Sequence, residues 1–480
     1  MPYILLAQSN GIKYSVENET VVTQSNTLPF WLRANKFGSI PVAGTSTAFI
    51  FNAQKNYADT VLPHKFNWAY GIETRANLGQ TSNLSIIQAY VKAKKGLFEL
   101  KAGRYKDIVG MVDTTLSSGA FTISGNALGI PQVELSLPNY YNIPWFDKLF
   151  AIRAAAGIGY VGTLDIIPNF SANFHTGITS SEGFYEHQFI YLRLGKPSWR
   201  LKLFGGINHH VMFANEKKIM QGNYDWSTLE TIIYAGIGKT YKGKSKVGNH
   251  IGSIDVNAQY EFENVRLMAY RQNIFDIGAL AHLANIADGI NGLSLTNKKF
   301  GARKIDWHKF LVEYVYTVNQ AGYFASRFTP SGAENYYNND EYNSGWTYYN
   351  SNLGNPLLAS RQYTHSSLVT SPLDIIIDNR VSAIHTAFEG AINKMGVLVK
   401  LTYSKNFGTY ATSPQGRSII GIHYPPQYGL FSQINQFSGL LGVNKKFANG
   451  YEAGVDFGVD KGDLYYDSAG LLFKLKKTFN

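Results

Sequence analysis

The chain of 480 residues has no cysteine, few charges and no long apolar run. Without cysteine it has no disulfide, no thiolate metal site and no cysteine-borne lipid anchor. Charged residues form 16% of the sequence, against roughly 25% in an average soluble protein. No stretch of about 18 apolar residues occurs, which argues against a helical membrane protein. A membrane β-barrel is still possible, because its strands need only about 9–11 residues and face lipid with alternate side chains.

Amphipathic rings are abundant: aromatic residues form 14% of the chain, with 32 Tyr and 29 Phe. The formal net charge is +11, and the basic residues are scattered, with only short pairs such as Lys94-Lys95 and Lys476-Lys477. This distribution is typical of a solvated basic rim. Outer-membrane lipid and lipopolysaccharide phosphates, or an anionic polysaccharide, are the next candidate partners, and nucleic acid is not expected.

Period-two alternation dominates the sequence, and its second face is polar or small, as the lumen of a barrel requires. Between Phe66 and Leu78, the alternation predicts that Trp68, Tyr70 and Ile72 face lipid and that Gly71 faces the interior. Segments 254–262 and 451–460 repeat the pattern. The residues expected to line the lumen are Asn67, Glu73, Arg75, Asp255, Glu261, Glu452 and Asp456.

The repeated alternation predicts an all-β, transmembrane antiparallel barrel of about 18 strands with long outward loops. The last strand, ending at Phe479, carries a polar, glycine and aromatic pattern that resembles the terminal signal of outer-membrane barrels. Besides the three segments above, the strand candidates are 46–53, 83–94, 96–106, 119–124, 130–137, 148–161, 185–195, 198–213, 229–239, 263–275, 306–317, 359–366, 380–392, 396–405, 430–446 and 463–479.

Three regions are expected along the chain. Residues 1–8 look like the end of a secretory signal, and we interpret them as a truncated signal-peptide remnant. Residues 9–40 form an N-terminal segment with a short helix stopped by Gly38, which could plug or brace the barrel. Residues 41–480 form the barrel. Its connections 276–305 and 318–379 far exceed a hairpin turn and are expected to face outward, where they could fold over the lumen.

Catalytic and metal-binding patterns are weak. His209 and His210 lie within a strand pattern and so point to opposite faces, which disfavours a shared metal. Asp460, Asp463 and Asp467 miss the spacing of a calcium loop and are interpreted as a solvated turn. The Gly-x-Ser-x-Gly spacing of a nucleophile elbow is absent. We therefore expect no catalytic residue, no metal and no cofactor, and predict that the chain is not an enzyme.

The segment 335–350 is different, because it concentrates aromatic rings and amides. Rings can stack on the C–H faces of sugars, and amides can bond their hydroxyls. An interfacial girdle or a self-packed loop is the alternative interpretation. The candidate polysaccharide-binding residues are Tyr336, Tyr337, Asn338, Tyr342, Trp346, Tyr348 and Tyr349, with Arg361 and Arg417 available for anionic sugars.

Four landmarks in order resemble the Wzi-type capsule-assembly proteins of Gram-negative outer membranes. They are the sequence from Pro29 to Gly38; Leu116 to Gly119 followed by Ser124 to Pro131; Asn285 to Leu293; and the Asn/Tyr loop with Tyr342, Gly345-Trp346 and Gly354-Asn355-Pro356. The resemblance implies a non-catalytic, 18-stranded outer-membrane barrel whose outward loops bind or anchor surface polysaccharide, as a lectin does. Two features depart from the family: Gly129 stands where proline is usual, and about 40 N-terminal residues leave little room for a helical bundle at the periplasmic end.

Two other function classes remain open from the sequence. A wall of about 18 strands can enclose a water-filled lumen, so a porin or channel is the main alternative. A barrel subunit of an envelope secretion or assembly complex is the third, although no residue pattern points to it.

Overall fold

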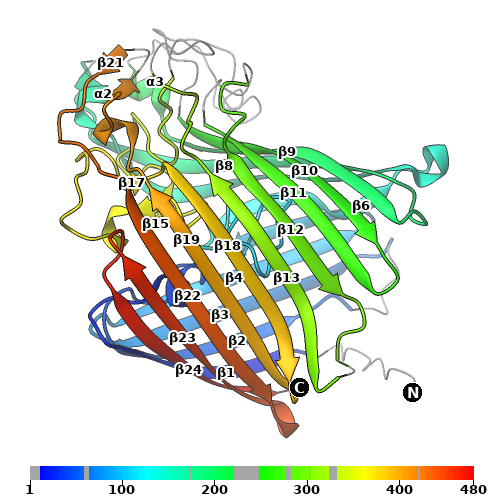
Figure 1. Ribbon diagram of the computed structural model, residues 1–480. Coiled ribbons are helices and arrows are strands. Elements are labelled where there is room, and N and C mark those ends of the chain that lie inside the picture. The colour runs from blue at the N-terminus through cyan, green and yellow to red at the C-terminus, as the bar shows by residue number, and fades with distance from the viewer. Residues whose placement is uncertain are drawn as a thin grey trace.

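The computed structural model describes residues 11–58, 64–172, 175–220, 248–276, 283–301, 303–323, 332–419 and 422–479. Eighteen strands form one sheet (Figure 1). They are β1 (Lys13–Thr23), β2 (Ser46–Lys55), β3 (Asn67–Gly79), β4 (Asn83–Lys95), β5 (Phe98–Arg104), β6 (Gln132–Asn142), β7 (Phe150–Asp165), β8 (Ser180–Leu194), β9 (Leu201–Phe213), β10 (Asn249–Glu261), β11 (Val265–Phe275), β12 (Gly289–Asn297), β13 (Ile305–Tyr316), β18 (Val381–Ile392), β19 (Met395–Asn406), β22 (Ile434–Lys446), β23 (Tyr451–Gly462) and β24 (Ser468–Phe479).

The remaining elements are short and lie in the connections. The short strands are β14 (Thr347–Tyr348), β15 (Ser351–Asn352), β16 (Ala359–Ser360), β17 (Ile376–Asp378), β20 (Arg417–Ile419) and β21 (Ile422–Tyr424). The helical turns are α1 (Phe30–Arg33), α2 (Pro168–Ala172), α3 (Glu216–Ile219), η1 (Trp145–Lys148), η3 (Arg361–Tyr363), η4 (Tyr410–Thr412) and η5 (Ala448–Gly450). Over the described ranges, no helix is long and apolar enough to cross a membrane.

The sheet closes on itself. Each long strand pairs antiparallel with the next one along the chain, and β1 pairs with β24, from Tyr14 opposite Phe479 to Thr23 opposite Gly470. Closure leaves no sheet edge with unpaired backbone groups in the hydrocarbon, which is the condition for spanning a bilayer with strands. The predicted fold class and strand number are confirmed.

Side chains alternate between the two faces of the wall. In β3, Trp68 and Ile72 are exposed on the outside, whereas Ala69 and Arg75 are buried inside. A slip of one residue would turn Arg75 toward lipid, which costs about 2–4 kcal/mol near the bilayer midplane, so the alternation fixes the register. Other exposed outward side chains include Leu84, Leu135, Ile190, Ile254, Leu401 and Phe473.

Connection length distinguishes the two ends of the barrel. One end carries short turns such as 96–97 and 393–394, together with the start of β1 and the end of β24. The other end carries long connections, including 24–45, 105–131 and 317–380. The connection 317–380, coloured mainly yellow, lies at the upper left of Figure 1. Long loops of such barrels face outward, so this end is extracellular and the short-turn end is periplasmic.

Several expected boundaries are wrong. The barrel begins at β1, Lys13–Thr23, and not at residue 41, so part of the expected N-terminal segment belongs to the wall. The expected connection 276–305 contains strand β12, whose Gly292 has no room for a side chain beneath the Tyr270 ring. Segments 119–124 and 359–366 form no barrel strand, and 229–239 lies outside the described residues. The sequence did not predict β1 and β12 as strands, because polar residues in β1 and glycine and polar residues in β12 hide the alternation.

Candidate functional site

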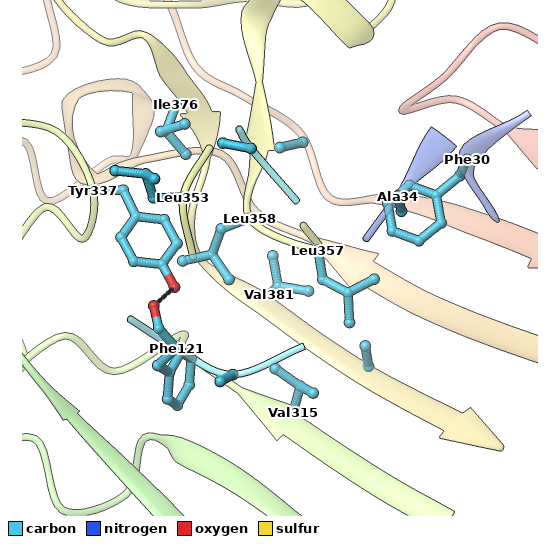
Figure 2. Close-up of a cluster of buried hydrophobic side chains, with 14 of the residues drawn as sticks. Phe30, Ala34, Phe121, Val315, Tyr337, Leu353, Leu357, Leu358, Ile376 and Val381 are labelled. Atoms are coloured by element: carbon cyan, nitrogen blue, oxygen red, sulfur yellow. Dashed lines mark hydrogen bonds between the residues drawn. The ribbon is translucent and has the colours of Figure 1, made fainter. Parts of the chain in front are cut away.

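The extracellular half of the lumen is filled by three segments that enter from the long-loop end. We call residues 28–40, 107–126 and 335–360 together the plug. Buried apolar side chains from all three belong to one core cluster, which Figure 2 shows around Phe121, Tyr337 and Leu358. The barrel therefore has a packed core in its lumen, and this core contains several of the candidate rings, among them Tyr336, Tyr337 and Trp346.

The first plug segment rests on one side of the wall. The backbone N–H of Phe30 donates to Asp460 Oδ2 on β23 at 2.7 Å, and Trp31 Nε1 donates to Thr402 Oγ1 on β19 at 3.1 Å. The helix α1 is a single turn that ends at Arg33, before the predicted stop at Gly38, and Asn35 turns the chain with a φ of 56°. The expected short helix is present, and it packs against β22 and β23 with its Phe30, Trp31 and Leu32 side chains buried.

The second plug segment is bonded to other strands of the wall, from β10 to β18. The N–H of Met111 donates to Asp255 on β10 at 2.8 Å, and Ser118 N–H donates to Glu313 on β13 at 2.7 Å. The ring of His385 on β18 lies 2.9 Å from the carbonyl oxygen of Leu116. Inward carboxylates of the wall thus accept hydrogen bonds from the plug backbone, and these bonds tie the second plug segment to the wall.

The third plug segment is bonded to the second. Trp346 Nε1 donates to the carbonyl of Thr122 at 2.8 Å, and Asn355 Nδ2 donates to the carbonyl of Gly119 at 2.6 Å. Tyr337 donates its hydroxyl to the carbonyl of Phe121, as Figure 2 shows. These bonds join segments far apart in sequence into one body.

The structure corrects the expected exposure of the aromatic loop. Trp346 and Tyr336 are 0% exposed, Tyr337 and Tyr342 are 1% exposed, and Tyr348 is 7% exposed. Their rings pack within the protein and have no free face for a sugar, which matches the alternative interpretation of a self-packed loop. Asn338 is buried as well and bonds the backbone of Ile376. Ring and amide content alone did not distinguish a sugar-binding loop from a self-packed one.

Other predicted sugar-contacting residues lie elsewhere. Tyr349 is 69% exposed at the outer end of the barrel. Arg361 is exposed, but its guanidinium donates to the carbonyls of Ser371 and Asp374, so it shapes its own loop. Arg417 is partly buried and lies over the ring of Tyr424 at 5.9 Å. The structure does not bring these three residues into direct contact with one another.

The predicted lumen residues lie on inward positions, where most contact opposite charges or amides. Arg75 pairs with Glu19, and Asp456 pairs with Lys474. Asp255 holds the plug. The remaining contacts are Glu73 with Lys106, Glu261 with Arg266 and Lys298, and Asn67 with the carbonyl of Ala58; Glu452 lies opposite Lys476 in the ladder. This pairing compensates charges that would be costly alone in a partly dry interior.

Sequence reasoning missed the carboxylates that anchor the plug, Glu313 and Asp113. Glu313 is 0% exposed, and Asp113 accepts from Ser294 at 2.8 Å and pairs with Lys309. The signal for Glu313 was available, because it alternates with outward Val312 and Tyr314, but its partners lie almost 200 residues away in sequence. His209 and His210 have different partners: the first ring contacts His250 and the second contacts Tyr185.

Exposed and half-buried rings at the extracellular end form a second feature. We call Tyr349, Gln362, Tyr363, His365 and Tyr466 the outer face. Gln362 donates to the carbonyl of Asn350, Tyr363 shares a hydrogen bond with Ser351, and the rings of His365 and Tyr466 lie 4.2 Å apart. Ordinary loop contacts therefore link η3 to 349–351 on one side and to the β23–β24 connection on the other. Rings and an amide remain accessible there.

The loop after β9 contains a buried carboxylate that predicts a pH response. Burial, with the adjacent Glu341, raises the pKa of Glu216 from 4.5 to about 7, although Tyr342 O–H and Ala214 N–H donate to it. Because the folded pKa is raised, Glu216 stabilises the docking of α3 fully below pH 4.5, and that contribution is lost as pH rises through 7.

We therefore expect faster amide hydrogen exchange at 216–220 at pH 8 than at pH 5, after correction for the intrinsic rate. Glu216→Gln should remove most of this difference, because the neutral amide does not titrate. Glu182→Gln, at an exposed carboxylate of β8, is the matched control and should keep it. An unchanged pH response in Glu216→Gln would contradict the assignment.

Comparison with known proteins supports the fold. No family model matches the sequence, and no curated protein matches it. Among solved structures, the chain is similar to Wzi of Escherichia coli, an outer membrane protein involved in group 1 capsule assembly and described as a carbohydrate binding beta-barrel. The two share 11% sequence identity with a TM-score of 0.56, and the match covers 97% of this chain and 84% of Wzi.

Two proteins of Pseudomonas aeruginosa also match. OccD3 has 9% identity, a TM-score of 0.44, and coverage of 98% of this chain and 91% of that one. OprD has 10% identity, a TM-score of 0.46, and coverage of 98% and 94%. At these identities the likeness concerns the fold. The chain is an 18-stranded β-barrel with the fold of Gram-negative outer-membrane proteins.

Proposed function

We propose that this barrel is a Wzi-like protein that binds or anchors surface polysaccharide through its extracellular loops. The observation that carries the proposal is the plug, which is bonded to β10, β13, β19 and β23 and fills the outer half of the lumen. A barrel with this core offers a stable outer surface instead of a wide path for solutes. The fold likeness to a carbohydrate-binding barrel supports the same assignment.

The outer face supplies the chemistry. Tyr349 is 69% exposed and Tyr466 is 36% exposed, and both lie beside polar side chains of the loops. Exposed rings can stack on sugar C–H faces, while Gln362 and nearby hydroxyls orient a chain by hydrogen bonds. The buried rings Tyr337 and Trp346 take part by holding this surface in place. An envelope partner protein is compatible with the same surface, but no contact favours it.

The test removes the two exposed rings. Tyr349→Ala with Tyr466→Ala should lower retention of the organism's own surface polysaccharide on cells at least several-fold. Stacking on an aromatic ring is worth about 1–3 kcal/mol for a nucleic-acid base, and we take that range as a rough analogue for sugars. Cell-bound polysaccharide is measured by immunostaining, and folded barrel by its heat-dependent gel migration.

The control variant is Trp145→Ala, which removes a ring that is 74% exposed at the periplasmic end. It should leave retention unchanged. Full retention in the double variant, with the barrel folded, would contradict the outer face as the contact surface. Equal losses in both variants would mean that any exposed ring matters and that the effect is not a specific contact.

A further inference from the structure

A second candidate site lies on the other side of the plug. A cavity of about 280 Å³ is lined by Trp31, Asn35 and Lys36 of the first plug segment, by residues 112–115 and Ser117 of the second, and by Leu398 and Lys400 of β19. Leu398 lies close to the periplasmic turn at 393–394, and Thr114 and Thr115 are exposed at the cavity. The cavity is therefore on the periplasmic side of the plug.

Two cations in this cavity differ from other lumen lysines. Lys106, Lys309 and Lys474 each pair with a carboxylate. Across the part of the chain that the structure describes, the side-chain ammonium groups of Lys36 and Lys400 form no hydrogen bond or ion pair, and Lys400 is only 8% exposed. Its ammonium lies 4.6 Å from the centre of the Trp31 ring. Unpaired buried charge is costly, so a bound anion would stabilise this arrangement.

The cavity also contains an unused acceptor. Asn35 Nδ2 donates to the carbonyl of Ser118 at 2.9 Å, whereas its Oδ1 is buried without a partner among the described residues. A buried amide oxygen without a donor loses free energy relative to water. Hydroxyl groups are suitable donors. The nearby hydroxyls of Ser117 and Thr115 are already engaged, with Glu313 and Asp113.

These observations point to one ligand class. We propose that the cavity binds a single acidic sugar unit from the periplasmic side, with its carboxylate between Lys36 and Lys400 and a hydroxyl on Asn35 Oδ1. Small-molecule sites have volumes of about 300–1,000 Å³, so a cavity of about 280 Å³ holds one ring rather than a chain. This site is separate from the outer face and does not depend on its function.

The probe is glucuronate, with glucose as the neutral match, titrated calorimetrically into the folded barrel in detergent. Glucuronate should bind at least tenfold more tightly than glucose, and the difference should shrink with added salt. Lys36→Met and Lys400→Met should each weaken glucuronate binding about tenfold, while Lys36→Arg retains most of it. Lys106→Met, which removes a lysine paired with Glu73 outside this cavity, is the control.

Two outcomes would overturn the proposal. Equal binding of glucuronate and glucose by the unaltered protein would show that the lysines do not select an anion, and this measurement needs no variant to fold. Equal loss in Lys106→Met would indicate a general effect of lumen charge. The outer-face double variant should bind glucuronate normally, so failure of the external site and failure of this one are distinguishable.

Discussion

Removing the second plug segment is expected to raise ion conductance at least tenfold. The intact barrel should show little conductance in planar bilayers, because the plug is bonded to several strands around the lumen. Gly103 and Gln132 face each other in the β5–β6 ladder. Residues 106–130 can therefore be replaced by a short glycine-containing hairpin turn without breaking the wall. Once the segment is gone, Asp255 and Glu313 face water.

The matched control is Thr114→Ala, which alters an exposed side chain of the same segment and keeps its anchors. It should conduct as little as the intact protein. Large, steady conductance of the intact protein would favour the channel interpretation. No change after removal of the segment would mean that other loops seal the lumen by themselves.

Replacing Trp346 with Ala is the substitution with the largest expected loss of stability. The ring is 0% exposed and its Nε1 bonds the carbonyl of Thr122. Truncating a buried Trp costs about 3–5 kcal/mol through lost contacts and a residual cavity. Guanidinium unfolding of the barrel in detergent should show a loss of that order, together with easier proteolysis of the loop 332–380.

Tyr349→Ala is the matched control three residues away. Its ring is 69% exposed, so the free energy of unfolding should change by no more than about 0.5 kcal/mol. Similar stability losses for the two variants would contradict the division between buried and exposed rings. A loss of polysaccharide retention in Trp346→Ala would follow from the lost stability of the loop. A loss of retention in the outer-face double variant is expected while the barrel stays folded.

The barrel itself was accessible from sequence because lipid imposes a simple pattern. Every second side chain of β3 must be apolar, and Trp68 and Ile72 satisfy that rule without reference to any partner. The strands that escaped, β1 and β12, replace part of the apolar face with Asn, Thr or Gly. The total of 18 strands was nevertheless predicted, because false candidates such as 119–124 offset the missed ones.

The plug was not accessible in this way. Phe121 and Thr122 alternate with apolar neighbours as a strand would, yet they bond Tyr337 and Trp346 from a distant loop. Such contacts depend on which segments enter the lumen, and local periodicity contains no information about that. The rings of 335–350 likewise give the same composition whether they face a sugar or a core. Only three-dimensional packing separates the two.

The bond from Phe30 N–H to Asp460 also constrains the order of assembly. Its donor follows the first strand, and its acceptor lies on the next-to-last strand. Residues 28–40 therefore reach their final position only when the end of the chain is in place. The same late step joins β1 to β24. In an insertion intermediate that lacks the last strands, β1 has no β24 to pair with, and residues 28–40 have no Asp460 to hold them in the lumen. Seam closure and sealing of the barrel are thus completed by a single late event.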